Sequence, residues 1–143
     1  MVKIPEYLWD HINNAYPQNG CLVSTLLPDG YSQVSPRGSV VVYDPETLAF
    51  WNLGAGSTRD NLKDGTKVTV YFRDPHLPEK GILPPRGGAR FYGQASLHAS
   101  GEVRDRVWDL QGPPIRERDP DCKGTAVLVR VERVEDLNHE PLE

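Results

Sequence analysis

The sequence predicts a mainly β protein, a small antiparallel barrel with a few short peripheral helices. Six or seven apolar runs of strand length are spread along the chain, and tight-turn signals join several of them. Strands and helices do not alternate regularly, as they would in a parallel, doubly wound sheet. At 143 residues the chain is expected to form one domain. We divide it into an N-terminal helix in 1–16, a barrel in 21–134 and a tail in 135–143.

The first half of the chain supplies the N-terminal helix and two strand pairs. Ile4, Leu8 and Ile12 recur at four-residue spacing, which predicts a helix over 5–15. The turn sequence Pro-Asp-Gly follows the first apolar run and predicts a hairpin. A second turn, Asp-Pro-Glu, separates the next two runs. We expect strands over 21–27, 31–34, 39–43 and 47–51.

The second half is predicted to hold the remaining strands and two helices. Ser57 or Thr58 can cap a short helix over 57–63, because their hydroxyls accept hydrogen bonds from free helix N–H groups. Val103, Val107 and Leu110 share one face of a second helix. The stretch 111–123 is interpreted as a polar connection, and Gly93 marks a bend or a close backbone approach in its strand. We expect strands over 67–72, 90–98 and 125–134, and a second helix over 102–110.

A proline- and glycine-rich loop over 74–89 interrupts the strands. It contains four prolines and no periodic pattern. Long loops in compact domains are often functional, so it is either a lid over a pocket or a surface excursion.

Composition excludes several classes of function. The formal net charge of −4 argues against nonspecific binding to nucleic acid or to an acidic membrane surface. No apolar run approaches the ~20 residues of a membrane span. The N-terminal residues have no apolar segment typical of a signal peptide, so a cytoplasmic location is expected. Cys21 and Cys122 are expected to be free thiols.

The residues around Arg59 suggest a phosphate site. Ser57, Thr58 and Arg59 would combine hydroxyl donors, helix N–H groups and a guanidinium if a helix begins there. Arg37, between a proline and a glycine before an apolar strand, can add a second guanidinium. The alternative stays open: Ser57 caps the helix, Arg59 is solvated, and Arg37 is exposed and paired with an Asp or Glu side chain.

Other candidate residues give weaker signals. Trp51 and Asn52 could flank a flat ring, although a core position for Trp51 is the simpler reading. The glycines at 54 and 56 do not continue into a dinucleotide-binding fingerprint, because Arg59 stands where the third glycine is required. No catalytic triad can be named. The histidines lack metal-ligand spacing, so no zinc site is expected; they are His11, His76, His98 and His139.

Four segments, in the order in which they follow one another along the chain, resemble the FMN-binding split barrel of the pyridoxamine 5'-phosphate oxidase family. They are Pro36–Val40, Phe50–Asn52, Ser57–Leu62 and Lys67–Phe72. The resemblance covers residues 21–98, with a last strand at 125–134. It implies a six-stranded antiparallel split barrel and a homodimer with two FMN sites at its interface.

The resemblance also implies roles for individual residues. Ser57, Thr58 and Arg59 would hold the FMN phosphate, Asn52 would lie near the ring or ribityl chain, and the partner subunit would reach the flavin through the region of Gln94. The cofactor-binding residues it implies are Arg37, Gly38, Ser39, Val40, Trp51, Asn52, Ser57, Thr58, Arg59 and Gln94.

The expected function is that of an FMN-dependent oxidoreductase of unknown substrate, reduced by a nicotinamide cofactor, with no catalytic acid assigned. The sequence ends soon after the last strand, where pyridoxamine 5'-phosphate oxidases continue into a substrate-binding extension, so oxidation of pyridoxamine phosphate is not expected. Alternatives are a deazaflavin-dependent reductase, or a non-catalytic flavin or haem carrier or sensor with His76 or His98 as the axial ligand. A third reading, a nucleic-acid-binding barrel with exposed aromatic rings, is opposed by the acidic charge.

Overall fold

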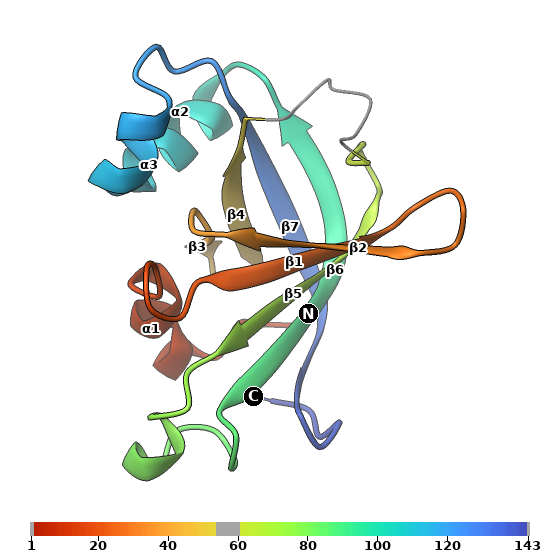
Figure 1. The fold of residues 1–143 in the computed structure, drawn as a ribbon, viewed down its shortest axis with the longest axis vertical. Coiled ribbons are helices and arrows are strands. Elements are labelled where there is room, and N and C mark those ends of the chain that lie inside the picture. Colours follow the sequence, from red (N-terminus) through yellow and green to blue (C-terminus); the bar gives the residue numbers. More distant parts are fainter. Residues whose placement is uncertain (1, 54–60, 143) are drawn as a thin grey trace.

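The computed structural model describes residues 2–53 and 61–142. These residues form one antiparallel sheet in the order β2-β1-β5-β6-β7-β4-β3 (Figure 1). The strands are β1 (Cys21–Leu26), β2 (Ser32–Arg37), β3 (Val41–Asp44), β4 (Thr47–Asn52), β5 (Lys67–Arg73), β6 (Gly88–His98) and β7 (Thr125–Asp136). The helices are α1 (Trp9–Asn13), α2 (Glu102–Leu110) and α3 (Pro113–Arg118), with 3-10 turns η1 (Glu6–Leu8) and η2 (Pro78–Lys80).

The sheet is strongly curved but not closed, which confirms the predicted mainly β, antiparallel class. The long strands β6 and β7 bend through the middle of the molecule and connect its two halves (Figure 1). The number of strands, seven, agrees with the six or seven predicted from the apolar runs. They exceed by one the six that the family resemblance implies.

The concave side of the sheet is filled by the main apolar core, and a second, smaller cluster around Trp51 and Val107 packs α2 against β4. Phe50, Phe72 and Phe91 are the largest fully buried side chains of the main core, one each from β4, β5 and β6. Leu8 and Ile12 from the N-terminal segment complete it, as their spacing predicted. Each such side chain contributes about 1.5–3 kcal/mol of burial free energy. The predicted N-terminal helix is divided into the 3-10 turn η1 and the short helix α1.

Gly93 lies at a β-bulge, as its position in the sequence suggested. The pairing of β6 with β7 shifts register between Tyr92 and Gly93. A Cβ atom at Gly93 would lie 2.3 Å from the carbonyl oxygen of Arg130 and 2.8 Å from Cγ1 of Val129. Only glycine allows the two backbones to approach so closely, and the bulge helps the sheet to bend.

Two sequence predictions are corrected by the structure. The stretch 111–123 contains α3, because a proline in the first helical turn is compatible with a helix. Residues 61–63, the described end of the predicted helix over 57–63, are not helical. At the end of the chain, β7 extends to Asp136, whose carboxylate accepts hydrogen bonds from the backbone N–H groups of Asn138 and Glu140.

The loop over 74–89 is anchored to the core. Leu77, at its centre, is fully buried, and its backbone carbonyl accepts bonds from the N–H groups of Lys80 and Ile82. Within residues 2–53 and 61–142, no helix is long and apolar enough to cross a membrane.

Candidate functional site

The curvature of the sheet brings Arg37 into contact with Asn52. Arg37 ends β2, an edge strand, and Asn52 ends β4, five positions away in the strand order. The Arg37 guanidinium donates a 3.3 Å hydrogen bond from Nη1 to the Asn52 side-chain oxygen, and it lies 5.3 Å from the centre of the Phe50 ring. Two predicted site residues, one from the edge strand β2 and one from β4 near the opposite edge, therefore meet in one place.

Ser39 connects the entry of β3 to the end of β4. Its hydroxyl accepts a hydrogen bond from the Trp51 backbone N–H at 2.9 Å and donates one to the Trp51 carbonyl at 3.2 Å. The Ser39 carbonyl accepts a further bond, at 3.0 Å, from the side-chain amide of Gln111. All three residues are buried. Ser39 therefore fixes the geometry of Trp51 and the preceding turn.

Trp51 is a core residue, the simpler of the two readings of its sequence position. Its indole ring is buried against Trp108 of α2, with ring centres 4.9 Å apart, and the Arg104 guanidinium lies 4.9 Å above it. The indole N–H donates a 2.9 Å hydrogen bond to Asp119. The ring thus joins β4 to the helical segment between β6 and β7.

Asp119 organises the end of that helical segment. Its carboxylate accepts bonds from the Trp51 indole and from the backbone N–H groups of Lys123 and Gly124. Burial alone would raise its pKa, but these hydrogen bonds and the nearby Arg104 charge together hold the pKa below its usual value. Asp119 is therefore ionised at neutral pH and acts as a fixed acceptor.

Gly38 and Val40 complete the turn that leads into β3. A Cβ atom on Gly38 would lie 2.4 Å from the ring of Tyr16, so the glycine allows this ring to pack against the turn. Val40 is buried in the main core. Gly38 therefore lets the turn pack against Tyr16, and Val40 anchors the turn in the core.

A small cavity gathers most of these residues together. Its volume is about 110 Å³, and it separates the turn before β3 from α3. The lining residues are Pro36, Arg37, Gly38, Ser39, Trp51, Leu53, Ile115 and Arg118. Sequence reasoning missed Ile115 and Arg118, because the prolines around them suggested a connection without regular structure.

The remaining predicted site residues are placed differently. Gln94 is exposed on the convex face of β6, opposite Lys67 of β5 and Arg130 of β7, and it does not join this cavity within one chain. The predicted phosphate-binding residues lie outside the described part of the chain; they are Ser57, Thr58 and Arg59.

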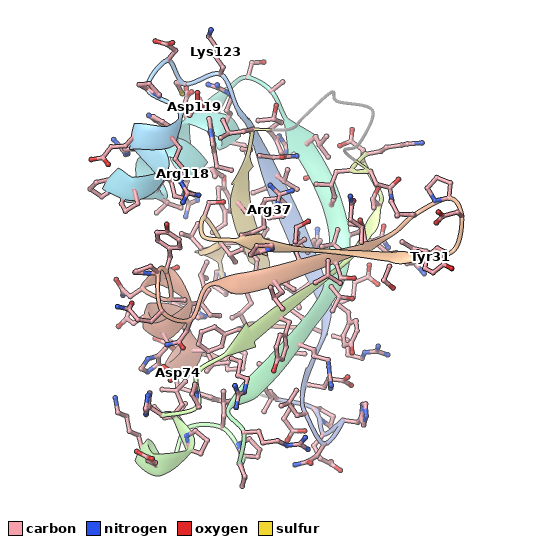
Figure 2. All side chains as sticks on the ribbon, in the orientation of Figure 1. Tyr31, Arg37, Asp74, Arg118, Asp119 and Lys123 are labelled. Atoms are coloured by element: carbon pink, nitrogen blue, oxygen red, sulfur yellow. The ribbon has the colours of Figure 1, made fainter. Side chains whose placement is uncertain are left out.

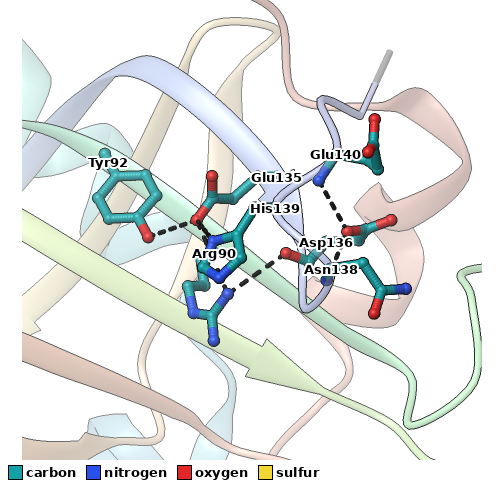
Figure 3. Close-up of polar contacts among 7 residues, drawn as sticks. All are labelled: Arg90, Tyr92, Glu135, Asp136, Asn138, His139 and Glu140. Carbon is teal, nitrogen blue, oxygen red and sulfur yellow. Dashed lines mark hydrogen bonds and ion pairs between the residues drawn. The ribbon is translucent and has the colours of Figure 1, made fainter.

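A second polar cluster lies where β6 begins and β7 ends (Figure 3). The Tyr92 hydroxyl donates a 2.7 Å hydrogen bond to Glu135, and Arg90 and His139 lie 3.7 and 3.4 Å from the same carboxylate oxygen. The Tyr92 bond above all holds the pKa of Glu135 below its usual value. This cluster fixes the chain after β7.

The two histidines considered as haem ligands lie at opposite ends of the sheet. His76 is exposed and follows β5 in the chain. The last residue of β5, Arg73, pairs with Gly88 at the start of β6, so His76 lies near that end of β6. His98 ends β6, and its ring nitrogen Nε2 lies 3.0 Å from the Ser96 hydroxyl. Among the described residues, no group of three or more His, Cys, Asp or Glu side chains could hold a metal ion.

Comparisons with known proteins identify related sequences and folds. A family model described as pyridoxamine 5'-phosphate oxidase matches residues 8–138. HupZ of Group A Streptococcus has a TM-score of 0.69 and 22% identity, with 98% of each chain covered. A putative pyridoxamine 5'-phosphate oxidase from Lactobacillus delbrueckii has a TM-score of 0.63 and 22% identity, with 93% of each chain covered.

An FMN-binding protein from Syntrophomonas wolfei has a TM-score of 0.62 and 16% identity, covering 96% of this chain and 87% of that one. No curated protein matches the sequence. At these identities, the solved structures show a shared fold.

Proposed function

The chain belongs to the pyridoxamine 5'-phosphate oxidase family, and on that premise we propose that it is an FMN-binding flavoprotein that acts as an oxidoreductase. The observation that carries the proposal is the meeting of Arg37 with Asn52 beside a cavity that Gly38 and Ser39 also line. These residues come from two of the segments that resemble the family's flavin site. The FMN-binding protein of the same fold supports this choice of cofactor.

The proposal assigns the cofactor's parts to different residues. Ser57, Thr58 and Arg59 hold the phosphate, for which hydroxyls and a guanidinium are suitable donors. Arg37 and Asn52 present a charged donor and an amide toward the flavin from the ends of β2 and β4. The bound FMN would supply hydride or electron transfer, with a nicotinamide cofactor as reductant.

Other residues of the site act by positioning. The Ser39 hydroxyl donates to the Trp51 carbonyl and accepts from the Trp51 backbone N–H. The Trp51 indole N–H donates to the Asp119 carboxylate. These two side chains therefore orient the strand ends that face the cofactor. Val40 supplies an apolar wall from the core.

The size of the cavity supports a site completed by a second subunit. Its volume of about 110 Å³ is well below the roughly 300–1,000 Å³ of ligand pockets in general. We therefore propose a homodimer in which Gln94 and its surroundings on β6 complete the partner's flavin site. Gln94 is exposed on the convex face, where a partner can reach it.

Exposed apolar side chains on the β1–β2 hairpin support an interface on this convex side. Leu26 is 65% exposed, Tyr31 73% and Val34 56%. Replacing both Leu26 and Val34 by glutamate is expected to shift the protein from dimer to monomer and to weaken FMN binding. Light scattering coupled to gel filtration measures the first effect. A wild-type protein that is monomeric when loaded with FMN would contradict the dimer.

The phosphate assignment is tested with two ligands that differ only in that group. Arg59→Ala is expected to weaken FMN binding about tenfold or more, because a charge-assisted hydrogen bond is lost, and to leave riboflavin binding nearly unchanged. Arg73→Ala is the control: it removes an exposed arginine from the end of β5, where its side chain donates a hydrogen bond to the Arg86 carbonyl. Equal weakening of both ligands by Arg59→Ala would mean that Arg59 does not hold the phosphate.

Turnover is tested separately from binding. FMN-loaded protein mixed anaerobically with NADH or NADPH should lose the visible absorption band of oxidised flavin. If neither nicotinamide reduces the flavin and the protein oxidises no amine, the oxidoreductase proposal fails. The chain would then be a flavin carrier or sensor.

A further inference from the structure

Arg118 has a different kind of hydrogen-bond partner from the other arginines of the helical segment between β6 and β7. Arg104, Arg106 and Arg116 all donate to backbone carbonyls and so act as structural clamps. Arg118, the last residue of α3, instead donates to the hydroxyl of Tyr16 at 2.9 Å and lies 5.6 Å from its ring centre. Its guanidinium is held by one side chain at the mouth of a cavity.

This guanidinium has donors to spare. A guanidinium carries five N–H donors, and the bond to Tyr16 uses one nitrogen, Nη2. Within residues 2–53 and 61–142, no carboxylate oxygen lies within 4.0 Å of the Arg118 side-chain nitrogens. Arg118 therefore carries a permanent positive charge with no acidic partner in the described part of the chain.

The cavity beside Arg118 has the character of a site for an organic anion. Arg118 on α3 and Arg37 at the end of β2 both line it. Apolar surface comes from Trp51, Leu53 and Ile115, and no acidic side chain is among the described lining residues. The Arg118 donors that the Tyr16 bond leaves unused are suited to the oxygens of such an anion.

The dimensions and geometry favour a carboxylate on a small body. Since each water occupies roughly 30 Å³ in the liquid, a cavity of about 110 Å³ has room for a carboxylate and a short or flat apolar part. The planar guanidinium fork matches the two oxygens of a carboxylate. Neither arginine loses its proton in the accessible pH range.

We propose that Arg37 and Arg118 form a carboxylate-binding subsite, and that the molecule meeting the flavin is a small organic acid. The identity of this molecule as the flavin's reaction partner rests on the proposed function. Anion binding by the subsite does not. Arg118 is then a specificity-determining residue, and Tyr16 positions its guanidinium.

The test compares benzoate with benzamide, which has a similar shape and no charge. Both are titrated into apo and FMN-loaded protein, with tryptophan fluorescence and flavin absorbance as readouts. Wild type should bind benzoate at least about tenfold more tightly than benzamide, since charge-assisted bonds to a carboxylate are about twice as strong as neutral ones. Arg118→Gln should weaken benzoate binding about tenfold or more and leave benzamide binding unchanged.

Lys123→Gln is the matched control. Lys123 is an exposed cation at the same end of the molecule and does not line the cavity (Figure 2). The Lys123→Gln substitution removes one positive charge, as Arg118→Gln does. It should change the benzoate affinity by less than about twofold at ordinary salt, where exposed charges are screened. Arg118→Lys, which keeps the charge but loses the fork, should fall between wild type and Arg118→Gln.

The outcomes separate this inference from the proposed function. If benzoate and benzamide bind equally, or if Arg118→Gln and Lys123→Gln have the same effect, the subsite is wrong. If Arg118→Gln weakens FMN but not riboflavin, Arg118 holds the cofactor's phosphate and the inference is also wrong. If the protein binds no FMN but discriminates benzoate through Arg118, the anion subsite stands and the flavin proposal fails.

Discussion

Asp119 provides the sharpest test of how the candidate site is held together. Its buried carboxylate accepts three hydrogen bonds, at 2.9 Å from the Trp51 indole, 2.9 Å from the Lys123 N–H and 2.8 Å from the Gly124 N–H. The bonds from Trp51 and Gly124 are buried. Asp119→Ala removes the acceptor and leaves these two donors without their partner.

The cost of this substitution can be worked from those bonds. Each buried donor left unsatisfied costs about 1–3 kcal/mol, and release of the carboxylate from its buried position offsets part of the sum. We expect a net loss of about 3 kcal/mol in the free energy of unfolding. For a domain of this size, that corresponds to a fall of roughly 10 °C in Tm. Asp119→Asn, which keeps one acceptor oxygen, should lose about half as much.

Urea unfolding measures this loss. The midpoint should fall while the m-value stays constant, because the surface exposed on unfolding is nearly the same. Asp121→Ala, at an exposed position two residues away, is the control and should cost less than about 0.5 kcal/mol. If Asp119→Ala costs no more than Asp121→Ala, the carboxylate does not anchor Trp51. FMN affinity should fall with stability, because Trp51 directly precedes Asn52.

Three further predictions follow from other parts of the fold. Gly93→Ala should cost about 2 kcal/mol or more in urea unfolding, because its Cβ would lie 2.3 Å from the Arg130 carbonyl oxygen; a neutral effect would contradict the bulge. Burial raises the pKa of Cys21 to about 12, so in the native protein its thiol should react with DTNB only at the rate of unfolding, and immediate modification of both cysteines would refute this. The Tyr92 hydrogen bond lowers the pKa of Glu135, so this carboxyl stabilises the fold above its unfolded pKa of about 4.3 and loses that contribution as pH falls through the lower folded value. Glu135→Gln should therefore flatten the loss of stability between about pH 5 and pH 3, and an unchanged pH profile would contradict the assignment.

The elements with strong local signals were predictable from the sequence. The spacing of Leu8 and Ile12 indicated a buried helical face, and both side chains are in the core. The Pro-Asp-Gly turn indicated the first hairpin, which is β1 and β2. The predicted helix over 102–110 is α2. Each of these depends on residues close together in the chain.

The contacts that build the site depend on tertiary structure and were not predictable in the same way. Arg37 and Asn52 were both candidates, but their contact requires a sheet that curls until β2 approaches β4. Arg118 was missed because the prolines before it, which begin α3, look like helix breakers in the sequence. Gln94 faces away from the cavity, and its expected role involves a second chain that one sequence cannot place.

The absorption spectrum of the purified protein, with chromatographic identification of the released cofactor, tests the central claim most directly. Flavin binding at the site of Arg37 and Asn52 predicts a yellow protein that releases FMN at about one molecule per chain. Arg37→Ala should reduce that yield while the protein stays folded. A colourless protein that takes up no added FMN, or one whose spectrum is that of haem alone, would contradict the proposed function.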